Sequence, residues 1–294
     1  MTAPRYGIAE WYGRRFTTLT PAERARLSRR ALGDEEAPPC PFQEGRPPCW
    51  KKLGVCSMVR YTHDDDDRIA EPEGDPVIMC PSRFEQGQLL VRWLADIVGF
   101  AADEVLLAHE VPFMLNPNTG RPAGMIDLVV AREPDGGLEW HGMEIQAVYF
   151  SGAGMRSEIE AQAGTRNDER PAPFPNAPRR PDWRSSSAKR LLPQLDVKVP
   201  LLVRWGRKTA VVVDRPFFDS IGGPSDEPDH DLNAGDLIWM VPELEVDDQG
   251  AYRLERGHWE VLTLEESRRK LLSAQPITRA EFETTLRGKL RPLR

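Results

Sequence analysis

The sequence predicts an α/β protein in which a mixed β-sheet is flanked by helices and preceded by a small, metal-stapled N-terminal module. An amphipathic helical pattern over residues 82–99 leads into three strand-like segments, and a continuous apolar run at Thr209–Asp214 has the composition of a buried strand. All four cysteines lie in residues 33–81, which are rich in Pro, Gly and charge and show no sustained period. Because such a segment cannot form a core of its own, we expect bound metal to order it.

Residues 82–99 place their apolar side chains on one helical stripe, with Ser82 and Glu85 at the spacing of a capping box and Gly99 at the end. The strand-like runs that follow are Val105–Leu115, Gly124–Ala131 and Leu138–Phe150, separated by turn-forming residues at 116–120 and 133–137. We therefore expect a helix followed by a β-meander.

The rest of the chain contains weaker patterns. Thr20 and Glu23 predict a capped, basic helix over residues 21–32, and residues 164–186 have the composition of a long loop. Beyond the loop we expect a helix at 188–203, strands at 237–241 and 259–264, and helices at 264–273 and 278–290. The predicted domains are a four-cysteine metal-binding module over residues 1–81 and a catalytic domain over residues 82–294.

Composition excludes several classes of protein. With 294 residues, 40% of them hydrophobic, and no run of 18 apolar residues, the chain has a globular composition without a membrane span. The first ten residues lack the features of a signal peptide, so we expect a cytoplasmic protein. Neither a Walker A sequence nor a G-x-S-x-G elbow occurs.

The charge of the chain is unevenly distributed. The formal net charge is -7, yet residues 176–210 contain nine Lys or Arg against two acids, and residues 1–60 contain eleven against six. A basic face of this kind suits the phosphates of nucleic acid, although a solvated surface is the alternative interpretation.

Three polar residues of the predicted meander form a candidate catalytic set: Asp127, Glu144 and Gln146. If the second turn centres on Pro134 and Asp135, residues whose numbers sum to about 270 lie opposite each other, so the carboxylates of Asp127 and Glu144 can converge. Paired carboxylates can hold Mg²⁺ against a scissile phosphate, and Gln146, two residues beyond Glu144, can orient water. The alternative is the ordinary polar face of a half-exposed sheet.

Glu85 and Glu110 are candidate auxiliary acids, with capping or solvated roles as the alternative.

The cysteines Cys40, Cys49, Cys56 and Cys80 have the spacing C-x8-C-x6-C-x23-C, which differs from that of common zinc fingers. In a reducing compartment, clustered cysteines bind metal more often than they form disulfides. A tetrahedral site of four thiolates suits iron or zinc and would supply the missing folding energy. Four unrelated thiols are the alternative.

A capped helix, three strands, an acid in the second strand and E-x-Q in the third together resemble the PD-(D/E)xK nuclease core. Here Ile126-Asp127 stands in place of Pro-Asp, and Gln146 in place of Lys. With the N-terminal four-cysteine segment, the pattern resembles the NotI-type restriction endonucleases over most of the chain. The resemblance implies an iron atom on Cys40, Cys49, Cys56 and Cys80, Mg²⁺ on Asp127 and Glu144, and a homodimer that cleaves double-stranded DNA at a GC-rich palindrome.

The Arg-rich loop at residues 166–190 would then follow the DNA backbone, with Arg179, Arg180 and Arg184 as candidate phosphate contacts. Arginine can also read guanine N7 and O6. Two alternatives stay open: a zinc-dependent DNA-binding regulator on an inactive nuclease-like scaffold, which Gln146 favours, and a repair nuclease that acts on mismatches.

Overall fold

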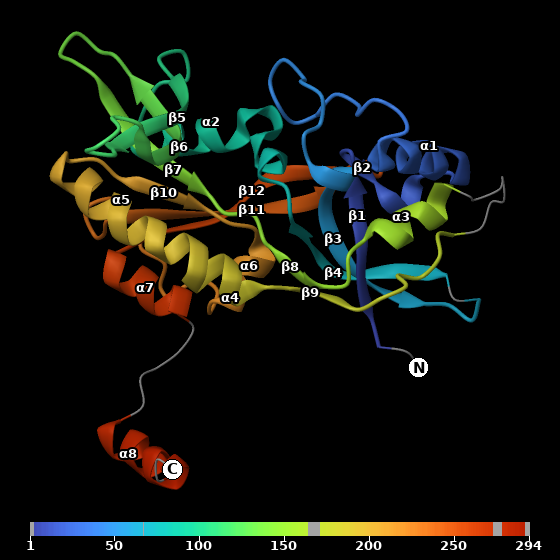
Figure 1. Ribbon diagram of the computed structural model, residues 1–294. Helices are drawn as coiled ribbons and strands as arrows, with labels where there is room; N and C mark the ends of the chain where they lie inside the picture. The colour runs from blue at the N-terminus through green and yellow to red at the C-terminus, as the bar shows by residue number, and fades with distance from the viewer. Residues whose placement is uncertain (1–2, 67, 164–170, 273–277, 292–294) are drawn as a thin grey trace.

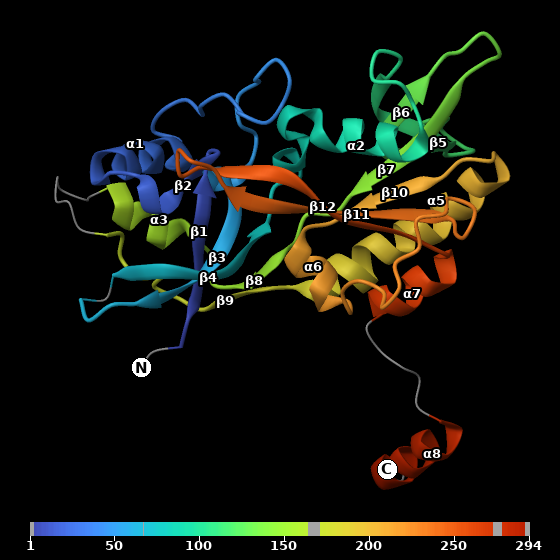
Figure 2. The ribbon, with the colours of Figure 1, turned by 180° about the vertical axis from the view of Figure 1, so that it is seen from behind.

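The computed structural model describes residues 3–66, 68–163, 171–272 and 278–291. Two larger sheets and a two-stranded ribbon form the framework, and the two larger sheets lie side by side in both views (Figures 1 and 2). Arg166 and the first part of the loop that we predicted from residue 164 lie outside the described residues.

The larger sheet has six strands in the order β12-β11-β10-β7-β6-β5. Its two central pairings, β7 with β10 and β10 with β11, are parallel, and the other three are antiparallel. This is the mixed sheet that the sequence predicts. Its strands are β5 (Leu106–Leu115), β6 (Pro122–Arg132), β7 (Glu139–Ile145), β10 (Thr209–Val212), β11 (Leu237–Val246) and β12 (Tyr252–Leu262).

Helices cover both faces of this sheet (Figure 1). On one face, α2 (Leu89–Val98) packs Leu90 and Leu94 against strand residues such as Val130. The other face is covered by α5 (Leu192–Arg204), α6 (Arg215–Ser220) and α7 (Leu264–Leu272), which share an apolar cluster with strand residues such as Val211. The α/β class is therefore confirmed.

The smaller sheet has the order β2-β1-β3-β4, and all of its strands come from the N-terminal region. Its strands are β1 (Arg5–Trp11), β2 (Arg14–Arg15), β3 (Val55–His63) and β4 (Ile69–Ile78). Two helices, α1 (Pro21–Leu32) and α3 (Arg156–Ala163), share its apolar core, and the Ser28 hydroxyl donates to the Ile159 carbonyl at 2.5 Å. Short 3-10 turns lie at Phe16–Thr18 (η1) and Lys52–Gly54 (η2).

Our expectation that residues 33–81 lack regular structure is wrong, because β3 and β4 lie in this segment. The core that buries these strands includes Met155 and Ile159, nearly one hundred residues further along the chain. Folding of the segment therefore does not depend on metal alone, and the domain boundary at residue 81 stays a prediction.

The helix expected at 82–99 is shorter than predicted. Residues Pro81–Gln88 form a 3-10 segment, η3, that breaks at Gln86 and Gly87, and α2 begins only at Leu89. Cys80 rather than Ser82 is the N-cap of η3 and makes no side-chain capping bond, whereas α2 ends at Gly99, as predicted, in the left-handed conformation with a φ of 77°.

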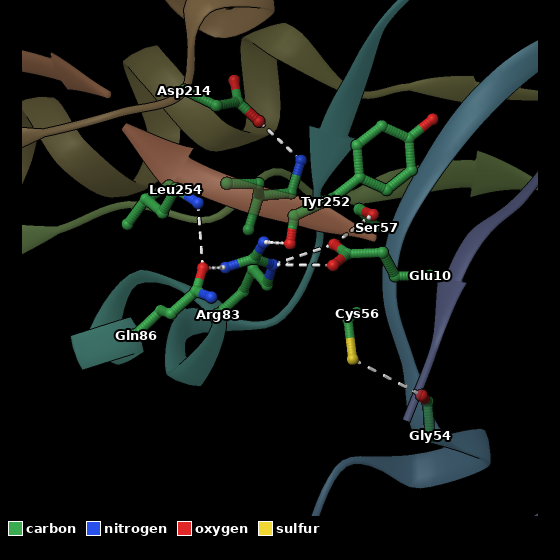
Figure 3. Close-up of polar contacts among 10 residues, drawn as sticks. Glu10, Gly54, Cys56, Ser57, Arg83, Gln86, Asp214, Tyr252 and Leu254 are labelled. Carbon is green, nitrogen blue, oxygen red and sulfur yellow. Dashed lines mark hydrogen bonds and ion pairs between the residues drawn. The ribbon is translucent and has the colours of Figure 1, made fainter. Parts of the chain in front are cut away.

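Tertiary contacts of Arg83 and Gln86 account for the break. The buried Arg83 donates to both carboxylate oxygens of Glu10 at 2.9 Å, and its second guanidinium branch donates to the Tyr252 carbonyl at 3.1 Å (Figure 3). Gln86 accepts from Arg83 at 2.7 Å and from the Leu254 amide at 2.9 Å. These bonds join β1 of the small sheet to β12 of the large sheet through η3, so this segment cannot follow a regular helical path.

The remaining elements are short. A ribbon of β8 (Phe150–Gly152) and β9 (Arg179–Pro181) is followed by α4 (Trp183–Ser186) and by η4 (Ser187–Leu191), which is a π-helix. The predicted capping box at Thr20 is present at α1, and the predicted C-terminal helix, α8 (Arg279–Lys289), begins with a second capping box at Thr278. Within the described ranges, every helix is too short or too polar to span a bilayer.

Candidate active site

The ladder between β6 and β7 has the register that the sequence predicts. Leu128 pairs with Met143 and Val129 with Gly142, so the next position along the ladder places Asp127 opposite Glu144. The Ile145 amide donates to Asp127 Oδ2 at 3.0 Å, which fixes the Asp127 carboxylate at the end of β7. Two acids far apart in the sequence thus lie side by side.

Glu110 extends this row to a third strand. In the β5–β6 ladder His109 pairs with Leu128 and Val111 with Ile126, so Glu110 lies opposite Asp127. Glu110 adopts a left-handed backbone with a φ of 49°, which is strained for a residue with a side chain and is common at functional sites. Its position agrees with the auxiliary role that we considered.

Glu144 is the most perturbed acid of the row. Its side chain is 2% exposed, Oε2 forms an ion pair with Lys198 of α5, and Oε1 is buried without a hydrogen-bond partner among the described residues. The pKa of Glu144 is raised to about 7, because burial and the negative charge of Asp127 raise it by more than Lys198 lowers it. An unsatisfied, buried carboxylate oxygen beside a second carboxylate fits a site for a divalent cation.

Lys198 is a residue that the sequence reasoning missed. In the sequence it is one of nine basic residues between 176 and 210, and nothing there shows that α5 packs behind β7. Its ammonium group also donates to Gln194 Oε1 at 3.1 Å. Lys198, on α5, therefore places a positive charge beside the carboxylates. The E-x-Q motif of this chain lacks the lysine that is usual at its last position.

Gln146 follows β7 and is 7% exposed. Its amide NH donates to the Val212 carbonyl at 3.0 Å, and its side-chain Nε2 donates to the Ala147 carbonyl at 2.5 Å. Met143 and Ala147 belong to the apolar cluster under α2, as the predicted alternation requires.

A cleft of about 1130 Å³ passes the open end of this row. Asp127, Gln146, Glu110 and Glu85 line it, and Gln43 donates to Glu85 at 3.2 Å. One wall comes from the cysteine segment, including Trp50 and Lys51, and the opposite wall comes from η4 and the start of α5. The cleft therefore lies between the cysteine segment and the β6–β7 hairpin.

The structure corrects the predicted phosphate contact at Arg179. Its side chain is 2% exposed, pairs with Glu158 at 2.6 Å and donates to the carbonyls of Ala153 and Gly154, so it stabilises the fold. Arg180 and Arg184 are exposed but do not line the cleft. The lysine and arginine residues that line the cleft are instead Lys51, Lys189 and Arg190.

The four cysteines come together as two backbone-linked pairs. Cys40 and Cys49 flank an antiparallel bridge between Pro39 and Pro48, and the Cys80 amide donates to the Cys56 carbonyl at 3.1 Å. All four are free thiols, and all but Cys49 are buried.

Burial raises the pKa of Cys49, Cys56 and Cys80, and charge on neighbouring cysteines raises each further. Electrostatic interactions between the thiols act over longer distances than a metal–sulfur bond, so they do not show that the sulfur atoms are close enough to share one ion. Among the described residues, no three His, Cys, Asp or Glu side chains are arranged closely enough to hold a metal ion. The thiols are therefore neighbours with the right chemistry for a soft metal, and the metal-stapled module stays a proposal.

The mixed sheet with a row of acids at an open cleft is a nuclease-like α/β fold. The family of the restriction endonuclease NotI matches residues 24–254, and the chain belongs to this family. It is therefore a type II site-specific deoxyribonuclease, a hydrolase that acts on double-stranded DNA. A search of curated proteins found no match. The alternative of a DNA-binding regulator on an inactive scaffold has no support from this family.

Proposed function

We propose that this restriction endonuclease hydrolyses duplex DNA with Mg²⁺ at a GC-rich palindrome, and that Asp127 and Glu144 hold the ion. The observation that carries the proposal is that these two carboxylates lie side by side next to the cleft. Among the described residues, the buried Oε1 atom of Glu144 has no hydrogen-bond partner. Mg²⁺ is usually bound by one or two protein carboxylates plus substrate phosphate and water, so two carboxylates suffice. When bound, the ion would stabilise negative charge on the phosphate and the leaving oxygen.

The residues around the pair have distinct roles in this proposal. Asp127, oriented by the Ile145 amide, faces the cleft, and Lys198 orients Glu144 from behind. Gln146 lines the cleft and can hydrogen-bond the attacking water, but its amide carries no charge. Glu110 is an auxiliary acid at the same row.

Three further features complete the proposal. The two cysteine pairs together bind one iron or zinc ion per chain, and this metal site stabilises the wall of the cleft at Trp50 and Lys51. A homodimer reads the palindrome, because two-fold symmetry in the protein matches two-fold symmetry in the site. The enzyme acts in the cytoplasm, where reducing conditions keep the cysteines as thiols.

Incubation with a long, GC-rich genomic DNA of known sequence tests the activity, with the fragment ends sequenced. We expect discrete fragments with identical ends in Mg²⁺, and site binding without cleavage in Ca²⁺, which coordinates oxygen more loosely. Faster cleavage of mismatched duplex would favour the repair nuclease instead.

Substitutions separate cleavage from binding. Asp127→Ala and Glu144→Ala should reduce cleavage by several orders of magnitude while the protein still binds its site in Ca²⁺. Gln146→Ala should have a smaller effect, and Gln146→Glu a larger one, since a further negative charge repels phosphate. Glu139→Ala is the matched control, because Glu139 lies on β7 but pairs with Arg132 away from the cleft. Near-normal cleavage by Asp127→Ala or Glu144→Ala would refute the assignment.

A further inference from the structure

The wall of the cleft opposite the cysteine segment contains a π-helix, and its two basic residues line the cleft. Leu192 closes the π-turn by donating its amide to the Ser187 carbonyl. A π-turn inserts one extra residue into a helix and is frequent at functional sites. Ser187 and Leu191 are buried here, whereas Lys189 and Arg190 between them are exposed on the cleft.

Arg190 is held in place by an aromatic ring. Its guanidinium lies 3.6 Å from the centroid of Tyr149, which also lines the cleft and is 44% exposed. Stacking covers the flat face of a guanidinium and leaves its N–H edge free for a bidentate contact with phosphate oxygens. Among the described residues, no acid forms an ion pair with Lys189 or Arg190, so both charges are available to a ligand.

Tyr149 is itself fixed to α4, the short helix that leads into the π-turn. Its amide donates to Ser186 Oγ at 3.0 Å, and its carbonyl accepts from the Asp182 amide at 2.6 Å. It follows Gln146 by three residues on the segment that continues β7. A ligand group bound by Arg190 is therefore held in a fixed relation to the catalytic residues.

We propose that Lys189 and Arg190, with Tyr149 as the stacking partner, form a clamp for the DNA backbone, in which each basic residue binds one phosphate of the strand that lies in the cleft. The clamp rests on the proposed function, because it takes the ligand of the cleft to be duplex DNA. It replaces the phosphate contacts that the sequence predicted at Arg179, Arg180 and Arg184. Arg179 forms an ion pair with Glu158, and Arg180 and Arg184 are not among the residues that line the cleft.

The test is equilibrium binding of a specific and a random duplex in Ca²⁺ at several salt concentrations. Each lost phosphate contact lowers the slope of log K against log salt by about 0.9, so Lys189→Ala/Arg190→Ala should lower it by about 1.8 for both duplexes. Arg190→Lys should keep the slope. Tyr149→Leu should also keep it but weaken binding about 2- to 5-fold, because the stacking that orders Arg190 is lost.

Arg184→Ala is the matched control, since Arg184 is an exposed arginine on the preceding helix that does not line the cleft. Its slope should equal that of the wild type, and all variants should unfold at the wild-type temperature. An unchanged slope in the double variant, or an equal loss in Arg184→Ala, would overturn the clamp. A protein that shows the expected slopes but never cleaves in Mg²⁺ would overturn the proposed active site and still support the clamp, whereas a wild type that binds no duplex would overturn both.

Discussion

The buried ion pair between Glu10 and Arg83 allows a quantitative prediction of stability. Both side chains are completely buried, and the carboxylate also accepts from Ser57 Oγ at 2.8 Å (Figure 3). Glu10→Gln keeps the shape but leaves the Arg83 cation without a counter-ion, and breaking a buried pair in this way costs about 3–5 kcal/mol of unfolding free energy. At this chain length about 2 °C is lost per kcal/mol, so the melting temperature should fall by roughly 6–10 °C.

Urea and thermal unfolding of single and double variants measure this effect. Glu10→Gln/Arg83→Met removes both charges, so it should be less destabilised than the sum of its two single variants. The control is Arg253→Met: its ion pair with Asp247 is as short, at 2.7 Å, but Arg253 is 51% exposed, so the cost should stay below about 1 kcal/mol. Additive single variants, or a Glu10→Gln protein as stable as the control, would refute this reasoning.

Three further predictions concern charge and metal. Lys198→Met leaves Glu144 unpaired, so it should destabilise the metal-free protein by about 3 kcal/mol. Ca²⁺ should then increase the stability of this variant more than that of the wild type. Equal Ca²⁺ effects on the two proteins would show that Lys198 does not interact with the metal site. Elemental analysis should find about one iron or zinc per chain, and Cys56→Ser should lower metal content and soluble yield together; folded, active protein without metal would contradict the four-cysteine site. Burial raises the pKa of Asp214 from 3.8 to about 7. Between these two pH values the folded state retains a proton that the unfolded state loses, so the contribution of Asp214 to stability falls as the pH rises from about 4 to about 7. Asp214→Asn should remove that part of the pH dependence of urea unfolding.

Local patterns in the sequence were sufficient to predict those elements that are stabilised by contacts between residues close together in the chain. The capping boxes at Thr20 and Thr278 form because the cap and its partner are three residues apart in the chain. The Asp127–Glu144 register could be predicted because a single short turn connects the two strands, and a turn sets the register of its hairpin. The acids of the candidate site were therefore accessible before the structure.

Contacts between distant segments decided the rest. The sequence does not show that α5 packs Lys198 behind Glu144, or that Arg190 stacks on Tyr149, because packing between elements is not encoded in the spacing within either one. The helix predicted from Ser82 fails for the same reason: Arg83 and Gln86 bond to Glu10 and Leu254, and these bonds outweigh helix propensities of less than about 1 kcal/mol per residue. The strands within residues 33–81 likewise share their core with residues far away in the chain, such as Ile8, Met155 and Ile159. Sequence alone thus identified the acids of the candidate site and the hairpin that carries them, and tertiary structure decided which charges surround these acids, because burial and counter-ions depend on the whole fold.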